Sequence, residues 1–310
     1  GFECVDRGDD RTDALDFALV AGAKKFGKKG VQNHETIAGK PHPKGNAKGS
    51  KVLKHGVNFL FQMGTAGSVE FKAKASGKQK RSLFQRLLHW FRIAVLVFVG
   101  SSVAVVLLYR FVPPPATPLM LLRLGNQLEE GKKFRLEKNW KPLEKISPYM
   151  AASVIISEDQ EFFEHHGFDF DAIRSAFKRN QTHKRIVGAS TITQQTAKNL
   201  FLWPARSWLR KGLEVYFTIL LEVFWSKHRI LEVYLNIIET GDGVYGVDAA
   251  ARRYFHSNAR ALNAEQSAMI AAILPKPRSW APPNATLRVY HRQAWVLRQM
   301  GNFVGRPELR

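Results

Sequence analysis

The clearest pattern along the chain is a run of seventeen residues, 93–109, without a charged side chain. It reads IAVLVFVGSSVAVVLLY, and Arg92 and Arg110 close it on its two sides. As a helix it would reach about 25 Å, close to the roughly 30 Å hydrocarbon core of a bilayer. The pattern predicts a transmembrane helix over 93–112, ended by the prolines at 113–115. A buried core helix or a cleaved signal peptide is the alternative, disfavoured by the sharp basic flanks and the position well inside the chain.

The segment after the prolines shows helical patterns almost throughout, and no internal repeat or strand ladder is expected there. Cap residues and apolar periodicity mark the expected helices. They start at the caps Ser147 and Ser190, cover about 207–225, 227–238 and 287–300, and include one that begins at a capping box of Asn263 and Gln266. The sequence therefore predicts a mainly α domain over 113–310.

Residues 1–92 differ from this domain in composition. Residues 22–80 are rich in Gly and Lys and show no periodicity, which predicts a disordered basic arm. Over the whole chain, 47 Lys and Arg against 26 Asp and Glu leave a net charge of +21, which favours an anionic partner. The basic residues precede the apolar run, so the positive-inside rule predicts a cytoplasmic N-terminus and an external domain. The single cysteine, Cys4, excludes a disulfide within the chain.

Acidic residues are scarce, yet six of them fall within SEDQEFFEHHGFDFD. They are Glu158, Asp159, Glu161, Glu164, Asp169 and Asp171. The segment follows an apolar helix and is interleaved with Phe162, Phe163 and Phe168. Some carboxylates are therefore expected against apolar surface, where burial favours a general base. A solvated helix end is the plainer alternative. The neighbouring His165 and His166 lack the spacing of a zinc site, and His165 is expected to orient the acidic loop by hydrogen bonding.

A second polar pattern is GASTITQQTAKN, residues 188–199. On a helix that starts near Ser190, the side chains of Thr191, Gln195 and Lys198 share one face. A hydroxyl, an amide and an ammonium in a row suit sugar hydroxyls or a phosphate, although an ordinary polar outer face is the alternative.

A third pattern is RKGLE, in which Arg210 and Glu214 lie one turn apart at the start of an apolar helix. The pair predicts either a simple ion pair or a carboxylate that serves a metal–pyrophosphate site. Two further acids in apolar helices are interpreted as buried partners of nearby basic or main-chain groups. They are Glu222 and Glu232, with Lys227 and Arg229 as the basic groups.

Five segments together resemble the five motifs of the peptidoglycan glycosyltransferases, glycosyltransferase family 51, and most closely the monofunctional biosynthetic type. The segments are EDQEFFEHHGFD, GASTITQQTAKNLFL, RKGLE, SKHRILEVYLN and GDGVYGVDAAARRYF. They occur in the family's order, and the resemblance covers about 110–305. It implies a mainly α, lysozyme-like helical domain on the outer face of the cytoplasmic membrane. It also implies polymerisation of lipid II into β-1,4-linked glycan, with inversion and release of undecaprenyl pyrophosphate.

The resemblance also implies roles for particular residues. Glu158 resembles the general base that deprotonates the acceptor 4-hydroxyl. Glu214 resembles a second essential acid that assists departure of the pyrophosphate through a divalent metal, Mg²⁺ or Mn²⁺. Supports of the first motif are expected at Asp159, Phe162 and His165. Donor-site contacts are expected at Thr191, Gln195, Lys198, Asn199 and Arg210.

The expected partners are lipid II, lipid-linked glycan, membrane phospholipids, and proteins of cell-wall synthesis or division. A basic flap resting on anionic headgroups, or a solvated basic face, is expected at Arg174, Lys178, Arg179, Lys184 and Arg185. Because the chain ends soon after the last motif, no transpeptidase domain is expected. A muramidase is one alternative, although it would not need the predicted pyrophosphate contacts. A membrane-tethered nucleic-acid binder is the other, and no nucleic acid is expected at an external domain.

Overall fold

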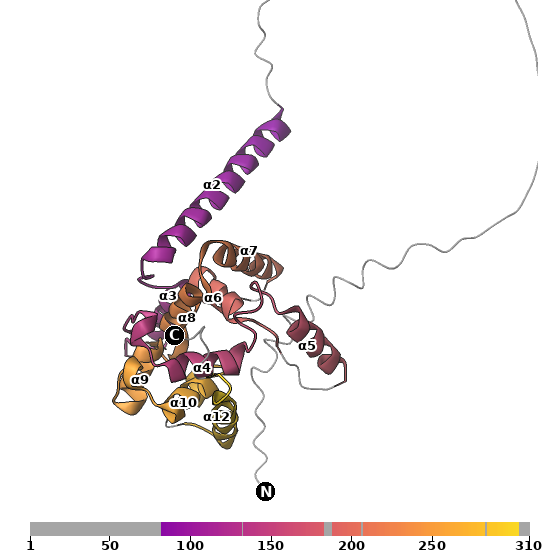
Figure 1. Ribbon diagram of the computed structural model, residues 1–310. Helices are drawn as coiled ribbons and strands as arrows, with labels where there is room; N and C mark the ends of the chain where they lie inside the picture. The colour runs from indigo at the N-terminus through magenta and orange to yellow at the C-terminus, as the bar shows by residue number, and fades with distance from the viewer. Residues whose placement is uncertain (1–81, 132, 183–187, 206, 283, 304–310) are drawn as a thin grey trace, which may run out of the picture. The chain divides into compact units, whose positions relative to one another are not determined.

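The computed structural model of the chain describes residues 82–131, 133–182, 188–205, 207–282 and 284–303. These residues are mainly helical, as the sequence predicts (Figure 1). The basic arm expected over 22–80, and Lys184 and Arg185 of the expected flap, lie outside the described residues.

The first described helix, α2, covers Leu83–Phe111 and contains the charge-free run. It starts earlier than the predicted span because the residues before Ile93 contain no helix breaker. It ends just before the prolines, which cannot continue a helix. By length and composition α2 is able to cross a membrane, and most of its surface is exposed, as a membrane helix requires. Its aromatic residues Trp90 and Phe91 are exposed, whereas Tyr109 is half-buried.

The other helices lie between residues 118 and 300. They are α3 (Pro118–Glu129), α4 (Pro148–Glu158), α5 (Phe170–Thr182), α6 (Ile192–Phe201), α7 (Trp208–Phe224), α8 (Lys227–Ile237), α9 (Val247–Phe255), α10 (Ala264–Ile273), α11 (Pro277–Trp280) and α12 (Leu287–Met300). The helix starts predicted at Ser147, Ser207 and the Asn263–Gln266 capping box are confirmed.

One predicted start is wrong, because α6 is capped by Thr191 rather than by Ser190. The Thr191 side chain accepts a hydrogen bond from the backbone N–H of Gln194, and the Gln194 side chain accepts one from the N–H of Thr191. This capping box needs a Gln or Glu three residues after the cap, which Thr191 has and Ser190 lacks.

A small sheet also contradicts the expectation of no strand ladder. Its strands β1 (Glu137–Lys138), β2 (Glu239–Gly241) and β3 (Val244–Tyr245) lie in the order β1-β3-β2, with β1 parallel and β2 antiparallel to β3. Strands of two or three residues are too short to show an alternating pattern in the sequence. The tight turn between β2 and β3 contains Gly243 at φ +72°, where an added Cβ would lie 2.5 Å from the Arg135 carbonyl oxygen.

The core is built around helices that are apolar on all sides. Every residue of α4 from Met150 to Ile156 is buried, and so is every residue of α10 from Ser267 to Ile273. The helix α10 packs against α4 and α12, while α6 packs against α7 and α8. A helix that is apolar on all sides must be surrounded by protein. The packing around α4 therefore fixes the position of its C-terminal end.

Candidate functional site

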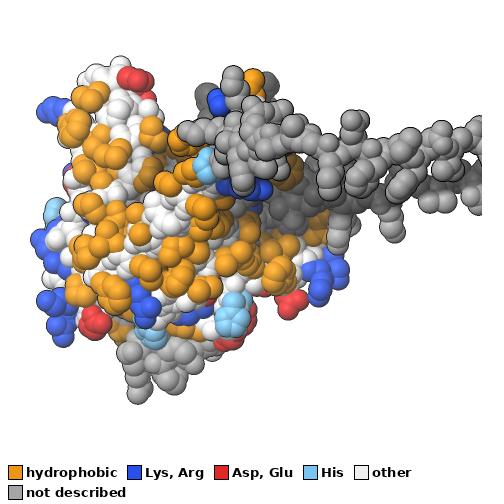
Figure 2. Space-filling view, turned by 90° about the horizontal axis from the view of Figure 1, so that it is seen from above, with side chains coloured by type: hydrophobic (Ala, Val, Ile, Leu, Met, Phe, Trp, Pro, Cys, Tyr) orange, Lys and Arg blue, Asp and Glu red, His pale blue; other side chains and the backbone are white. Residues whose placement is uncertain are grey.

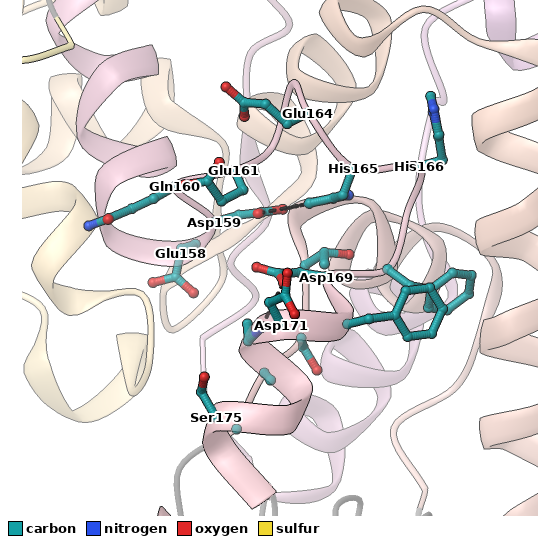
Figure 3. A pocket seen from close by; sticks show the side chains of 17 residues that line it. Glu158, Asp159, Gln160, Glu161, Glu164, His165, His166, Asp169, Asp171 and Ser175 are labelled. Atoms are coloured by element: carbon teal, nitrogen blue, oxygen red, sulfur yellow. Dashed lines mark hydrogen bonds and ion pairs between the residues drawn. The ribbon is translucent and has the colours of Figure 1, made fainter.

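A cavity of about 860 Å³ opens beside the C-terminal end of α4 (Figure 3). Its volume falls within the roughly 300–1,000 Å³ of typical ligand pockets. The lining comes from the acidic loop, the start of α5 and the segment before α6, namely residues 158–161, 164–166, 168–172, 175 and 188–191. All six carboxylates of the acidic segment line the cavity, so the segment surrounds a binding space and is more than a solvated helix end.

Glu158 is the last residue of α4, and three side-chain donors hold its carboxylate. Its Oε1 accepts hydrogen bonds from Arg292 Nη2 at 2.9 Å and from Ser157 Oγ at 3.1 Å. Its Oε2 accepts one from Gln195 Nε2 at 3.1 Å. The side chain remains 13% exposed and lines the cavity. The predicted base is therefore fixed in orientation while its carboxylate still reaches the space where a substrate would bind.

Sequence reasoning missed Arg292, which lies on α12. Besides Glu158, its Nη2 donates to the Ser157 backbone oxygen at 3.0 Å and to Ser157 Oγ at 2.7 Å. Arg292 therefore joins α12 to the end of α4 and places a positive charge at the predicted base. No local signal distinguishes Arg292 from the other basic residues of that helix, because the contact joins segments far apart in the chain.

Gln195 is oriented by a second residue that sequence reasoning missed, Tyr234 of α8. The Tyr234 hydroxyl donates to Gln195 Oε1 at 3.1 Å, which leaves the Gln195 amide N–H to face Glu158. Complete burial and then the negative charge of Glu158 raise the pKa of Tyr234 well above 10, so the hydroxyl keeps its proton. A signal existed in the sequence, since a tyrosine inside an apolar helix needs a partner for its hydroxyl.

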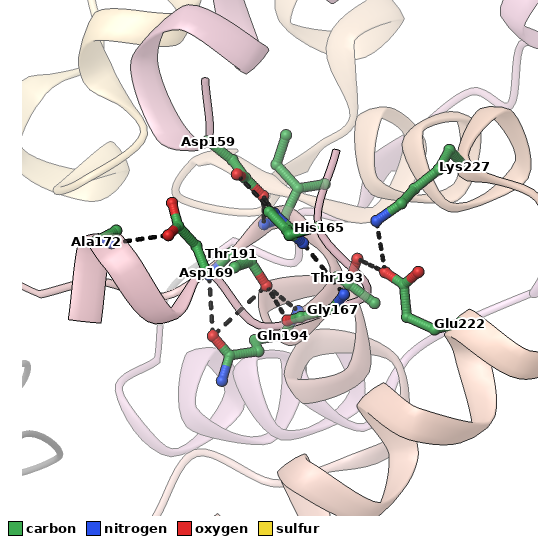
Figure 4. Close-up of polar contacts among 11 residues, drawn as sticks. Asp159, His165, Gly167, Asp169, Ala172, Thr191, Thr193, Gln194, Glu222 and Lys227 are labelled. Atoms are coloured by element: carbon green, nitrogen blue, oxygen red, sulfur yellow. Dashed lines mark hydrogen bonds and ion pairs between the residues drawn. The ribbon is translucent and has the colours of Figure 1, made fainter. Parts of the chain in front are cut away.

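Asp159 ties the acidic loop to the start of α6 (Figure 4). Its Oδ2 accepts from the backbone N–H of Ile192 at 2.9 Å, and His165 Nε2 lies 2.8 Å from Oδ1. His165 Nδ1 accepts from the Gly167 N–H at 3.1 Å, and the Thr191 hydroxyl donates to the Gly167 oxygen at 2.7 Å. The prediction that His165 orients the acidic loop by hydrogen bonding is confirmed. A carboxylate at this helix N-terminus also suits the helix dipole.

Phe162 supports the loop by packing, because it is fully buried in the core. Its ring lies edge-on to Phe163, with centroids 5.1 Å apart, and Lys227 Nζ lies 4.7 Å from its centre. Lys227 pairs with Glu222 at 2.8 Å, and Glu222 also accepts from the Thr193 hydroxyl at 2.6 Å. The interpretation of Glu222 as a buried partner is confirmed, and Phe162 has no surface for a substrate to touch.

The predicted polar face of α6 is only partly present. Thr191 is buried as the cap, and its hydroxyl is engaged as described above, so it does not share an open face with the others. Gln195 is used to hold Glu158. Lys198 and Asn199 are half-buried, and their side chains make no hydrogen bond or ion pair with the part of the chain that the structure describes. These two side chains keep their bonding capacity for a ligand.

Glu214 lies buried on α7 between two cations. Its Oε2 accepts from Arg210 Nη1 at 3.2 Å, which confirms the i,i+4 ion pair. Its Oε1 accepts from Lys211 Nζ at 2.7 Å, a partner visible in the RKGLE segment that sequence reasoning passed over. Glu214 is not among the residues that line the cavity at Glu158. Two cations against one carboxylate leave this part of α7 with an excess of positive charge.

The surroundings of Glu214 do not fit a metal held by protein ligands. Both carboxylate oxygens already accept from cations, which compete with a metal ion for the same lone pairs. Among the residues that the structure describes, no three His, Cys, Asp or Glu side chains are grouped so that they hold a metal. A role for Mg²⁺ or Mn²⁺ therefore stays a prediction.

Comparison with known proteins agrees with the motifs. Residues 125–301 match the transglycosylase family. A biosynthetic peptidoglycan transglycosylase of Bdellovibrio bacteriovorus is 54% identical over 220 residues, 71% of this chain and 88% of that protein. The corresponding proteins of Pseudomonas fluorescens and Caulobacter vibrioides are 48% and 52% identical, over 72% and 63% of this chain and 93% and 83% of theirs. The chain therefore belongs to the transglycosylase family, and it is a peptidoglycan glycosyltransferase.

Proposed function

We propose that this glycosyltransferase polymerises lipid II, transferring a lipid-linked glycan onto the 4-hydroxyl of lipid II with Glu158 as the general base. The observation that supports this proposal most strongly is the Glu158 carboxylate, fixed by Arg292, Ser157 and Gln195 at the edge of an 860 Å³ cavity. A base must be aimed at the proton that it removes, and three donors from separate residues provide that aim.

The proposed step is a single displacement. The acceptor 4-hydroxyl oxygen forms a bond to C1 of the donor sugar, and its proton passes to the Glu158 carboxylate. The C1–oxygen bond to the pyrophosphate breaks at the same time, and undecaprenyl pyrophosphate departs with the bonding electrons. Attack from the side opposite the leaving group converts an α-linked donor into a β-1,4 product. Pyrophosphate leaves as a stabilised anion, so the step needs no strong acid of the kind that a glycosidic oxygen requires.

Positive charge for the pyrophosphate is proposed to come from α6 and α7. These two helices pack against each other, and they carry Lys198, Arg210 and Lys211. Lys198 has no partner among the described residues, and Arg210 and Lys211 together outweigh the charge of Glu214. Preorganised cations of this kind stabilise the charge that develops on a leaving phosphate.

A membrane location fits a substrate that carries a lipid. The helix α2 is able to span a bilayer, and this supports a single-pass anchor in the cytoplasmic membrane. The basic residues before α2 favour a cytoplasmic N-terminus and a catalytic domain on the periplasmic side. The exposed Phe170 and the basic Arg174 and Lys178 on α5 favour contact with anionic headgroups.

The test is polymerisation of lipid II by the full chain in phospholipid vesicles. Glu158→Gln keeps the shape of the side chain and removes its basicity, so glycan synthesis should fall by about 10²–10⁴-fold. Glycan length on gels and release of undecaprenyl pyrophosphate measure the loss. Glu144→Gln, at an exposed carboxylate outside the cavity, is the matched control and should keep the wild-type rate.

Two results would contradict the proposal. Normal polymerisation by Glu158→Gln would remove the base assignment. A wild-type protein that shortened purified glycan strands but ignored lipid II would establish the muramidase alternative.

A further inference from the structure

The end of the membrane helix α2 has an unusual shortage of backbone donors. The last carbonyls of a helix have no partner within the helix and depend on donors from elsewhere in the chain or from solvent. The next three residues after Val112 are Pro113, Pro114 and Pro115, none of which has an N–H group. Unpaired carbonyls next to a bilayer are costly, so other groups must supply the missing hydrogen bonds.

Arg229 of α8 supplies part of them. Its Nη2 donates to the Tyr109 carbonyl at 2.8 Å and to the Val112 carbonyl at 3.1 Å, and its Nε also donates to Tyr109 at 3.2 Å. The same guanidinium pairs with Glu232. One side chain of the catalytic domain therefore closes the end of the membrane helix with charge-assisted hydrogen bonds.

Lys138 of β1 binds the proline segment that follows the helix. Its Nζ donates to the carbonyls of Pro114 and Pro115, the latter at 3.0 Å. Lys138 and Arg229 both lie over the ring of Trp140, with Lys138 Nζ at 5.8 Å and Arg229 Cζ at 5.3 Å from its centre. The two cations and this aromatic ring form one clamp on the chain just after the membrane helix.

The helix is also attached along the half that approaches the domain. Trp225 Nε1 donates to the Val106 carbonyl at 2.8 Å, and the Ser102 and Tyr216 hydroxyls share a hydrogen bond of 2.6 Å. Ser102 and Val106 are the buried residues of α2. Tyr216 lies two residues after Glu214 on α7, so these contacts join α2 to the same helix that carries the predicted leaving-group contacts.

The surface beside this junction suits a bilayer. The exposed apolar side chains of α7 include Trp208, Leu209, Ile219 and Val223. Figure 2 looks down on the end of the molecule where Figure 1 draws α2 and α7, and apolar side chains cover much of that face, with charged side chains toward its edge. A face of this composition would lie against lipid, with its basic rim at the headgroups.

We propose that Arg229 and Lys138 are positioning residues that fix the catalytic cavity at one height and orientation relative to the membrane helix. This inference rests on the proposed use of lipid II, whose reacting sugar is itself held at a fixed distance from the bilayer by its lipid. A cavity held at a fixed height above the bilayer lies where the reacting sugar is, so the two are often correctly placed for reaction. A cavity that moves freely relative to the helix reaches this arrangement only occasionally.

The test compares two substrates for the full chain in phospholipid vesicles. One is lipid II with its undecaprenyl chain, embedded in the same vesicles, and the other is a lipid II analogue whose prenyl chain is shortened until it dissolves in water. The double variant Arg229→Gln, Lys138→Met should lose on the order of 10- to 100-fold in rate on the embedded substrate and less than about threefold on the soluble one. Arg229→Lys, which keeps one charged donor, should lose less than Arg229→Gln.

The control is Arg253→Gln, which removes another partly exposed, ion-paired arginine that has no contact with α2. It should leave the ratio of the two rates unchanged. Equal losses of the double variant on both substrates would overturn the proposal, because they would indicate a general effect on folding or chemistry.

A distance measurement tests the junction independently of activity. In a Cys4→Ser background, spin labels are placed at the exposed Ser101 of α2 and at the exposed Arg260 of the catalytic domain. The wild-type pair should give one narrow distance distribution, and the double variant a broad one. If the distance distribution of the double variant stayed as narrow as that of the wild type, the proposed role of Arg229 and Lys138 would be overturned. If the wild type used neither substrate, the proposed function would fail, while the distance distribution would still decide the junction.

Discussion

Glu158 and Glu214, the two acids with proposed roles, differ in what surrounds them. Glu158 has one cationic partner, Arg292, and a carboxylate that lines the cavity. Glu214 is only 2% exposed and lies between Arg210 and Lys211. A carboxylate with access to a cavity is able to take a proton from a substrate, whereas one between two cations holds those cations in place. The two acids therefore suit different tasks, and the second acts through its basic neighbours.

Glu214→Gln tests this difference at the scale of one residue. The change leaves Arg210 and Lys211 without their counter-charge, so turnover should fall severely and the domain should lose about 3–5 kcal/mol of stability. The divalent-ion concentration that gives half-maximal rate should stay as in the wild type, because the carboxylate oxygens accept from cations rather than from a metal. Rate against Mg²⁺ or Mn²⁺ concentration measures this.

The control for lost stability alone is Glu222→Gln, which breaks the buried pair with Lys227. If its turnover fell as far as that of Glu214→Gln, the specific role of Glu214 would have to be abandoned. A weaker metal response in Glu214→Gln would instead restore the metal-holding role expected from the sequence.

At the scale of elements, close packing joins the small sheet to α9. The small sheet is packed so tightly against α9 that a Cβ at Gly241 would lie 2.0 Å from the Tyr254 hydroxyl oxygen. That hydroxyl donates to the Thr240 carbonyl at 3.0 Å. Burial is the main cause that raises the pKa of Tyr254 to about 12. The hydroxyl therefore stays protonated at any pH of physiological interest and keeps the strand in contact with the helix.

Gly241→Ala should destabilise the domain by about 1–3 kcal/mol, because the methyl group has no room beside the Tyr254 hydroxyl. Tyr254→Phe removes the obstructing atom, since the next ring carbon lies 3.4 Å from the added Cβ. The double variant should therefore be more stable than the sum of the two single changes predicts. Chemical denaturation of all four proteins measures the coupling, and simple additivity would contradict the packing argument.

Tyr254 also predicts a dependence on pH. Its pKa is raised in the folded protein, so its contribution to stability is complete below about pH 10, where an unfolded tyrosine titrates. The contribution is lost as the pH rises from there toward about 12. As the pH rises from 9 to about 12, the free energy of unfolding should fall less in Tyr254→Phe than in the wild type. Equal losses in the two proteins would assign the alkaline effect to other groups.

At the scale of the whole molecule, the chain combines the apolar helix α2, which is able to cross a membrane, with a domain of the transglycosylase family. The orientation across the membrane is predicted from the basic residues before α2. A substrate with a lipid tail would reach the cavity only from the side of the bilayer on which the domain lies. Orientation is therefore a condition for the proposed function and is open to direct measurement.

The single native cysteine offers that measurement. In intact cells, a membrane-impermeant maleimide should label Arg260→Cys in the domain that is predicted to be external, and it should leave Cys4 unlabelled until the membrane is permeabilised. A cysteine-free protein is the control for background. Labelling of Cys4 in intact cells, with Arg260→Cys protected, would reverse the predicted orientation.

Features that depend on neighbouring residues were predictable from the sequence. The apolar helix, the proline stop and most helix starts follow from local periodicity and capping, because their hydrogen bonds join residues three or four positions apart. The same reasoning located the acidic loop, the role of His165 and the Arg210–Glu214 pair. The order of the five motifs indicates the family without any tertiary contact.

Features that join distant segments were decided by the tertiary structure alone. Arg292 contacts Glu158 from a helix far along the chain, and Tyr234 orients Gln195. Arg229 binds carbonyls at the end of α2, more than a hundred residues before it. The strands are too short to show an alternating pattern of apolar and polar residues in the sequence. In each case the packing of the helices determines which side chains are in contact. Neither the composition nor the spacing of residues in the sequence shows these contacts.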